Sequence, residues 1–130
     1  MDTKVLVVGP PRTGKSTAAD FIAHALNLPL YHSDVYKELP WDEQKQVVGK
    51  LIRSLSGFVF EGCTVSRALN MFRETNPSFK PCDTVFYLTK YLVPRNDLTP
   101  GQLSMGTRIR NHMLEVVPWL QSLNVRMVIL

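Results

Sequence analysis

Residues 9–17 have the sequence GPPRTGKST and follow the short apolar run KVLVV at residues 4–8. Gly9 and Gly14, together with Lys15 and Ser16, match G-x-x-x-x-G-K-[ST], the pattern of a phosphate-binding loop between a strand and a helix. Beyond Lys15, apolar residues recur at helical spacing as far as Asn27, which is a plausible helix terminator. The pattern therefore stands between a predicted strand and a predicted helix, which is the setting that this loop requires.

The phosphate loop, as we call residues 9–17, predicts binding of a purine nucleoside triphosphate together with magnesium. Glycines let the backbone curl until successive N–H groups face phosphate oxygens, and the following helix N-terminus adds partial positive charge. We expect Lys15 to bridge the β- and γ-phosphates and Ser16 to offer its hydroxyl to Mg²⁺, with Thr17 behind it. The predicted nucleotide-binding residues are Gly9, Pro11, Arg12, Thr13, Gly14, Lys15, Ser16 and Thr17.

The rest of the chain alternates strands with helices. Apolar runs predict strands at residues 4–8, 28–32, 57–60, 85–88 and 125–130. Apolar residues at helical spacing predict helices at residues 15–27, 41–55, 65–73 and 103–123, with loops at 74–82 and 94–101. Because each strand is almost continuously apolar, the pattern predicts an α/β fold whose parallel sheet is covered by helices on both faces.

Length and composition indicate a single globular domain spanning residues 1–130. The chain is 45% hydrophobic and 20% charged, which is ordinary for a globular protein and argues against disorder. Its net charge of +4 suits a triphosphate site and permits, without requiring, a nucleic-acid partner. We find no run of about 18 apolar residues that would predict a membrane span, and no secretion signal. The two cysteines, Cys63 and Cys82, are isolated, so we expect reduced thiols in a cytoplasmic protein.

Acidic residues follow two of the predicted strands, at the edge of the sheet where ligands bind in folds of this class. Asp34, in the segment HSD, is a candidate catalytic base that would accept a proton from an attacking hydroxyl. The alternative is that Ser33 and Asp34 only end a strand and begin a turn. Glu61 is a candidate magnesium residue that would act on a metal-bound water. Many strands end in an acidic residue, so a purely structural role for Glu61 is also open.

Arginines are the candidate groups for the acceptor and for the transferred phosphate. Arg67 could hold a phosphate or carboxylate of the acceptor through a bidentate contact, although a solvated helix arginine is the alternative. Arg108 and Arg110 are two residues apart on a predicted helix and point to different faces, so one at most should reach the triphosphate, and we favour Arg108. Gly101 and Gly106 could hinge a lid over the site, the alternative being a plain surface helix.

Other polar and aromatic residues have weaker signals. His24, His32 and His112 share no metal-ligand spacing, and we assign none of them a catalytic role. Tyr36 and Trp41 lie near Asp34 in the sequence and could stack on a base or a sugar. Core packing is the interpretation that we favour for both aromatic residues.

The order GPPRTGKST, HSD, FVFEGCTVSRAL, VFYLTK and a late helix bearing arginines resembles the small P-loop kinases. These include adenylate, shikimate and gluconate kinases and the kinase domain of polynucleotide kinase, and the compact chain is similar to versions encoded by bacteriophages. The resemblance implies a three-layer fold with strand order 2-3-1-4-5, ATP and Mg²⁺ as cosubstrates, and transfer to a hydroxyl or a phosphate. It also implies that Asp34 meets the acceptor, that Arg67 binds it, and that Arg108 is a lid arginine.

Three departures from that family bear on function. Such kinases usually continue beyond the fifth strand into an adenine-contacting loop and a last helix, whereas this sequence ends at Leu130. The predicted lid of this chain is shorter than theirs. Its second acidic residue is Glu61 instead of an aspartate. We expect a phosphotransferase whose small acceptor is a nucleoside or a nucleotide. A nucleotide-binding regulator without turnover and a kinase for the 5′ end of a nucleic acid are the alternatives. The sequence does not indicate an oligomeric state.

Overall fold

Five parallel strands form the centre of the molecule. The structure, a computed structural model, describes residues 3–130. Its strands are β1 (Lys4–Val8), β2 (Leu30–His32), β3 (Phe58–Glu61), β4 (Thr84–Tyr87) and β5 (Arg126–Ile129). They pair in the order β2-β3-β1-β4-β5, and every pair is parallel. The predicted parallel sheet and its strand order are therefore confirmed.

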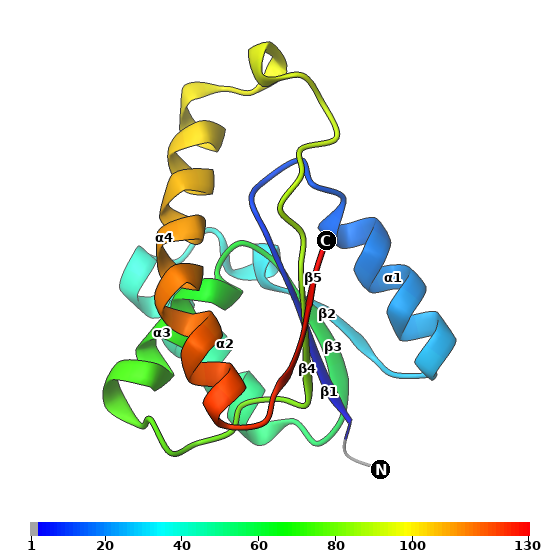
Figure 1. The fold of residues 1–130 in the computed structure, drawn as a ribbon, viewed down its shortest axis with the longest axis vertical. Helices are drawn as coiled ribbons and strands as arrows, with labels where there is room; N and C mark the ends of the chain where they lie inside the picture. The colour runs from blue at the N-terminus through cyan, green and yellow to red at the C-terminus, as the bar shows by residue number, and fades with distance from the viewer. Residues whose placement is uncertain (1–2) are drawn as a thin grey trace.

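Helices cover both faces of this sheet, but unequally (Figure 1). Helix α1 (Lys15–Leu26) lies alone on one face, and α2 (Trp41–Ser54), α3 (Val65–Thr75) and α4 (Pro100–Ser122) lie on the other. Two short 3₁₀ helices, η1 (Ser33–Tyr36) and η2 (Arg95–Asp97), stand in the connections. Helix α1 ends at the predicted terminator, because Asn27 adopts the left-handed conformation with φ of 54°. None of the helices in residues 3–130 is long and apolar enough to cross a membrane.

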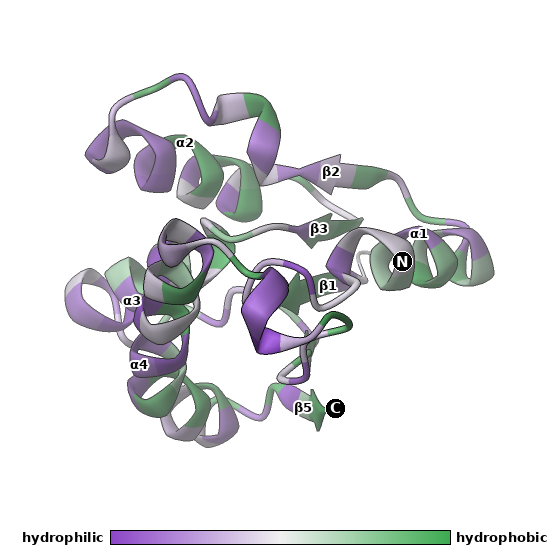
Figure 2. Cartoon of the chain, turned by 90° about the horizontal axis from the view of Figure 1, so that it is seen from above, coloured by the Kyte–Doolittle hydropathy of each residue, from purple (hydrophilic) through white to green (hydrophobic). Residues whose placement is uncertain are grey.

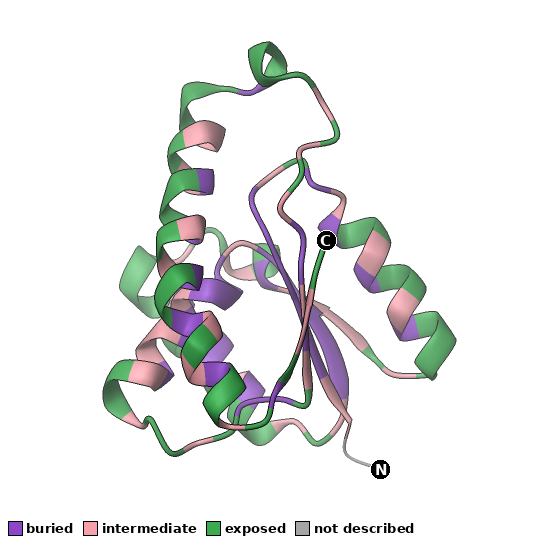
Figure 3. Cartoon of the chain, in the orientation of Figure 1, coloured by how far each residue is buried: buried purple, intermediate pink, exposed green. Residues whose placement is uncertain are grey.

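The core has a large and a small half because side chains alternate along β1. Leu6 and Val8 join the larger cluster under α2, α3 and α4, whereas Val5 and Val7 join the smaller cluster under α1. Figure 3 shows β1 and β3 as the most buried strands, while α1 leaves its outer side exposed. Full burial of an apolar side chain such as Phe58 contributes about 1.5–3 kcal/mol.

The pairing register brings three strand ends to one edge of the sheet. Glu61 pairs with Val7 of β1 on one side and with His32 of β2 on the other. The phosphate loop begins directly after β1, so it leaves the sheet at this same edge. Figure 2 looks down on that edge, with the ends of β1, β2 and β3 side by side. Residues 9–17, Asp34 and Glu61 are therefore neighbours in space, as the polar strand ends predict.

Gly62 is the position where this arrangement is tightest. Its φ is +140°, and a Cβ placed there would lie 1.8 Å from Ser33 Oγ. Ser33 is itself buried at the start of η1, so it has little room to move. Gly62 thus allows the ends of β2 and β3 to approach each other.

We predict that Gly62→Ala lowers the free energy of unfolding by about 1–3 kcal/mol, since overpacking and an unfavourable φ act together. The measurement is a denaturant titration followed by circular dichroism. The control is Gly101→Ala at the exposed start of α4, where the nearest atom to an added Cβ is 3.9 Å away. Equal unfolding midpoints for Gly62→Ala and the wild type would contradict this account of the strand ends.

Candidate functional site

The phosphate loop is held closed by its own side chains. Thr13 Oγ1 donates to the Pro10 carbonyl over 2.8 Å, and Lys15 Nζ donates to the same oxygen over 2.9 Å. A Cβ on Gly9 would lie 2.4 Å from the Leu88 carbonyl oxygen, so only glycine allows this close approach to the end of β4. Lys15 is 8% exposed, and its ammonium group therefore lies within the loop instead of reaching into solvent.

Ser16 and Glu61 come together from different elements. The Ser16 hydroxyl, in the first turn of α1, lies 3.4 Å from Oε1 of Glu61 at the end of β3. Hydroxyl and carboxylate oxygens are the ligands that Mg²⁺ prefers, and Mg²⁺ usually takes its remaining ligands from waters and substrate phosphates. Within residues 3–130, no three histidine, cysteine or acidic side chains form a metal site by themselves. Ser16 and Glu61 are therefore suited to a Mg²⁺ ion that binds together with a triphosphate.

His32 is a further contact of Glu61 that our sequence analysis missed. Its Nδ1 lies 2.5 Å from the same oxygen, Oε1, that faces Ser16. The Glu61 side chain is 3% exposed, so His32 and Ser16 supply the polar contacts of a buried carboxylate. The sequence signal for His32 was its place two residues before Asp34 at a strand end, not any metal-ligand spacing.

A pocket lies beside the phosphate loop, where Cys63 of its lining comes near Lys15. Its volume is about 320 Å³, and we call it the acceptor pocket; its lining residues are Ser33, Asp34, Lys37, Trp41, Gln44, Cys63, Thr64 and Met105. Asp34 comes from η1, which directly follows β2. One wall is fixed by hydrogen bonds, because Thr64 Oγ1 donates to Gln44 Oε1 and Gln44 Nε2 donates to the Leu39 carbonyl. This volume suits a small molecule.

Cys63 marks where the acceptor pocket meets the phosphate loop. Burial raises the pKa of the Cys63 thiol, although the nearby Lys15 ammonium group opposes that rise. The Asp34 and Glu61 carboxylates raise the pKa of this thiol further, so all three charged groups lie near it. A thiol with a raised pKa stays protonated and is a poor nucleophile. Cys63 and Cys82 are both free, as the sequence predicted.

Two arginines meet at Trp41, which lines the acceptor pocket, although neither arginine is itself among the residues that line it. The guanidinium carbon of Arg67, on α3, is 4.6 Å from the centre of the Trp41 ring, and that of Arg108, on α4, is 5.2 Å away. Burial and the Arg108 charge together lower the pKa of Arg67. Its acidic neighbour Asp42 is highly exposed and lies 4.0 Å away, so it offsets little of this repulsion. We call these three residues, Arg67, Trp41 and Arg108, the arginine cluster. Because its two positive charges repel each other, binding of an anion there is favourable.

The structure does not contain the lid hinge that we expected from the sequence. Gly101 and Gly106 are helical residues of α4, so neither stands in a loop that could act as a hinge. Arg108 shares a cavity of about 450 Å³ with Pro11 of the phosphate loop as well as contacting Trp41. Arg110 lies elsewhere, with its Nη1 3.5 Å from the Tyr91 hydroxyl. Arg108 and Arg110 thus point to different faces, as we expected.

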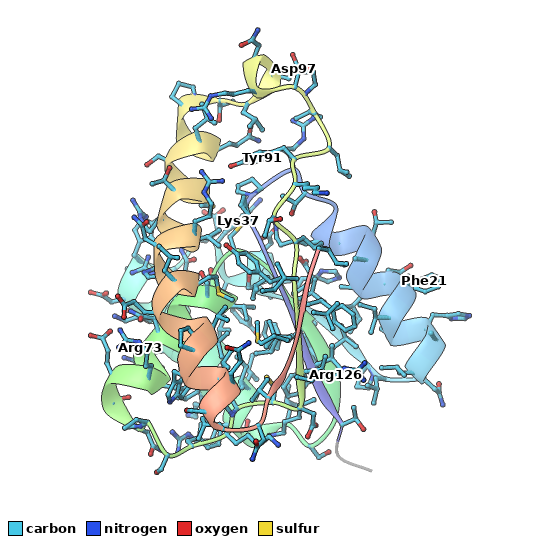
Figure 4. The ribbon with its side chains drawn as sticks, in the orientation of Figure 1. Phe21, Lys37, Arg73, Tyr91, Asp97 and Arg126 are labelled. Carbon is cyan, nitrogen blue, oxygen red and sulfur yellow. The ribbon has the colours of Figure 1, made fainter. Side chains whose placement is uncertain are left out.

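The aromatic residues near Asp34 divide into two kinds. Tyr36 is partly buried and packs against the larger core, as we expected. Trp41 is 46% exposed and lines the acceptor pocket, so the core-packing interpretation was wrong for Trp41. Figure 4 shows Tyr91 directed from the segment above the sheet toward α4. A side chain on Gly106 would clash with that tyrosine hydroxyl.

Comparisons with known proteins agree with this architecture. No family model matches the chain. Over 69 residues the chain is 41% identical to a shikimate kinase of Rhodococcus jostii (strain RHA1), a match that covers 53% of this chain and 36% of that protein. The matching segment therefore spans about a third of the curated relative.

Solved structures extend the likeness to nearly the whole chain. A gluconokinase from Sinorhizobium meliloti 1021 superposes with a TM-score of 0.53 at 15% identity, covering 98% of this chain and 81% of that one. Shikimate kinase from Acinetobacter baumannii, in complex with shikimate, gives 0.50 at 14%, covering 97% and 82%. Shikimate kinase from Aquifex aeolicus vf5 gives 0.50 at 15%, covering 97% and 85%. The chain has the P-loop fold found in these small-molecule kinases.

Proposed function

We propose that this protein is a P-loop kinase that transfers the γ-phosphate of ATP, or of another nucleoside triphosphate, to a hydroxyl group of a small anionic acceptor. One observation carries the proposal: the phosphate loop and the Ser16–Glu61 pair meet a pocket lined by Asp34 at one edge of the sheet. The kinase relatives support the same reaction class. A nucleoside monophosphate or another acceptor with a hydroxyl and an anionic group fits this description.

The phosphate loop binds the phosphates of the nucleotide. Backbone N–H groups of residues 12–17 surround the phosphates, and the Lys15 ammonium exchanges the Pro10 carbonyl for phosphate oxygens. Ser16 and Glu61 are the residues that would hold magnesium, which when bound neutralises charge on the β- and γ-phosphates. Lys15 then stabilises negative charge on one side of the reacting phosphorus, where Ser16 and Glu61 would hold the metal.

Asp34 supplies the base on the other side. Its carboxylate accepts the proton of the acceptor hydroxyl as the new oxygen–phosphorus bond forms. The bond between the γ-phosphorus and the β,γ-bridging oxygen breaks, and the nucleoside diphosphate leaves. The partly enclosed pocket limits competition from water, so that the acceptor hydroxyl, held near Asp34, is the nucleophile.

The arginine cluster selects the charge of the acceptor. We predict that Arg67→Ala raises the KM for the acceptor about 10- to 100-fold, because a hydrogen bond to a charged group contributes about 1.5–3 kcal/mol. The KM for ATP should change little, since the guanidinium of Arg67 lies beside Trp41 and Asp42, outside the phosphate loop. Arg67→Lys should recover only part of the affinity, because an ammonium group lacks the planar fork of a guanidinium.

Steady-state kinetics with varied acceptor checks this prediction. The control is Arg73→Ala, on the same helix, whose guanidinium bonds to Asn70 in the preceding turn. An acceptor KM that is the same in Arg67→Ala, Arg73→Ala and the wild type would refute the assignment of Arg67.

A transfer assay with labelled γ-phosphate tests the proposed function as a whole. The acceptors are nucleosides, nucleoside monophosphates, sugars, hydroxy acids and oligonucleotide 5′ ends. Label on one of the anionic small molecules is the expected result. Tight nucleotide binding without transfer to any acceptor would favour a regulator that lacks turnover. Transfer to oligonucleotide ends, with acceptor binding that weakens steeply as salt rises, would favour a polynucleotide kinase instead.

A further inference from the structure

His32, Glu61 and Ser16 form a chain of polar contacts across three elements. His32 ends β2, Glu61 ends the neighbouring strand β3, and Ser16 lies in the first turn of α1. His32 and Glu61 are register partners, which places their side chains on the same face of the sheet. One carboxylate oxygen, Oε1 of Glu61, faces His32 Nδ1 at 2.5 Å and Ser16 Oγ at 3.4 Å.

The chemistry of the three groups fixes the direction of each hydrogen bond. An ionised carboxylate only accepts, so His32 must carry a proton on Nδ1 and Ser16 must direct its hydroxyl proton at Glu61. A hydroxyl that donates its one proton in this direction leaves its lone pairs free on the other side. The Ser16 oxygen is thereby prepared to accept a cation.

We propose that His32 is a positioning residue for the magnesium site. Its Nδ1–H holds Glu61 Oε1 in the orientation that accepts the Ser16 proton, and so keeps the Ser16 lone pairs available to the metal. This role rests on the proposed triphosphate and magnesium site and extends it to a residue that touches neither the metal nor the substrate. Partners that orient metal ligands in this way affect metal affinity about 10- to 100-fold when they are removed.

Alternative contacts of Glu61 do not replace His32. The carboxylate is 3% exposed, so solvent has little access to it, and the Ser16 hydrogen bond at 3.4 Å is longer, and therefore weaker, than the His32 contact at 2.5 Å. An apolar side chain at position 32 would leave the carboxylate free to rotate away from Ser16. The His32 side chain is 41% exposed, so a substitution there disturbs little packing.

The experiment measures how much magnesium strengthens ADP binding, by calorimetry with Mg²⁺ and again with a chelator. We compare the wild type with His32→Leu, His32→Asn and the control His24→Leu, whose histidine is exposed on α1 away from the site. An asparagine amide nitrogen occupies nearly the position of histidine Nδ1. The magnesium gain should fall about tenfold in His32→Leu and stay near the wild-type value in His32→Asn and His24→Leu.

Two results would overturn the role of His32. They differ in whether the proposed kinase function fails as well. If the wild type gains affinity from magnesium and folded His32→Leu gains as much or more, the positioning role fails while the proposed function stands. If the wild type binds no nucleotide, the proposed function fails and the role of His32 fails with it.

Nitrogen NMR of the wild type adds a test that needs no variant at position 32. The proton of the neutral His32 ring should reside on Nδ1, and a proton on Nε2 alone would refute the proposal.

Discussion

Lys15→Ala should bind ATP at least about 100-fold more weakly than the wild type, because two hydrogen bonds from an ammonium group to phosphate oxygens contribute about 1.5–3 kcal/mol each. In the structure Lys15 Nζ lies within the phosphate loop, on the Pro10 carbonyl. Alanine leaves the loop backbone and the start of α1 in place, since Thr13 still bonds to Pro10. The loss should therefore appear in binding and not in folding.

Calorimetry with ATP and Mg²⁺ measures this loss directly. Lys50→Ala is the matched control, since it removes an exposed lysine from α2 and changes the net charge by the same amount. A Lys15→Ala protein that binds ATP as tightly as the wild type would show that residues 9–17 do not hold the triphosphate.

Asp34→Asn should lower the rate of phosphate transfer by about 10²- to 10⁴-fold, because this is the usual contribution of a general base. The affinity for ATP should not change. The amide keeps the size of the side chain and cannot take up the acceptor proton. Asp34 lies in η1 and lines the acceptor pocket, whose lining includes none of residues 9–17. The effect should fall on kcat.

Initial rates and ATP binding are measured together on the same preparation of Asp34→Asn. Asp42→Asn, an exposed residue in the first turn of α2, serves as the control for loss of one carboxylate charge near the pocket. Wild-type turnover in Asp34→Asn would remove Asp34 from the mechanism and leave its alternative role, as a residue that ends a strand.

The fold could be predicted from the sequence because its signals are local. The run KVLVV, the glycine pattern that follows it and the helical spacing after Lys15 specify β1, the phosphate loop and α1 in turn. The strand order came from the resemblance of the motifs to P-loop kinases, and the structure confirms it. The start of α4 was placed three residues late, at residue 103 instead of Pro100.

That late start has a physical cause that the sequence does contain. Thr99 and Gln102 form a capping box, in which each side chain bonds to the backbone of the other, and Pro100 occupies the first turn. Reading residues 94–101 as a loop overlooked this signal. Once α4 begins at Pro100, Gly101 and Gly106 become helical, and the hinge assigned to them no longer has a loop in which to act.

The roles of His32 and Trp41 depend on contacts between distant segments. His32 meets Glu61 because β2 pairs with β3, and Trp41 meets Arg67 and Arg108 because α2, α3 and α4 pack together. Neither contact leaves a pattern along the chain, since the partners are separated by tens of residues. Asp34 and Glu61 were found because each follows a strand, and the side chains that orient or accompany them became visible only through packing.

The central claim, transfer from a triphosphate at the phosphate loop to an acceptor beside Asp34, is tested most directly by following the labelled γ-phosphate of ATP. The wild type is incubated with Mg²⁺ and with hydroxyl compounds that carry a carboxylate or a phosphate. We predict that label appears in a phosphate ester of one such compound, and that Lys15→Ala forms none of it. ATP that binds to the wild type yet keeps its label with every acceptor, or releases it only as inorganic phosphate, would contradict the account.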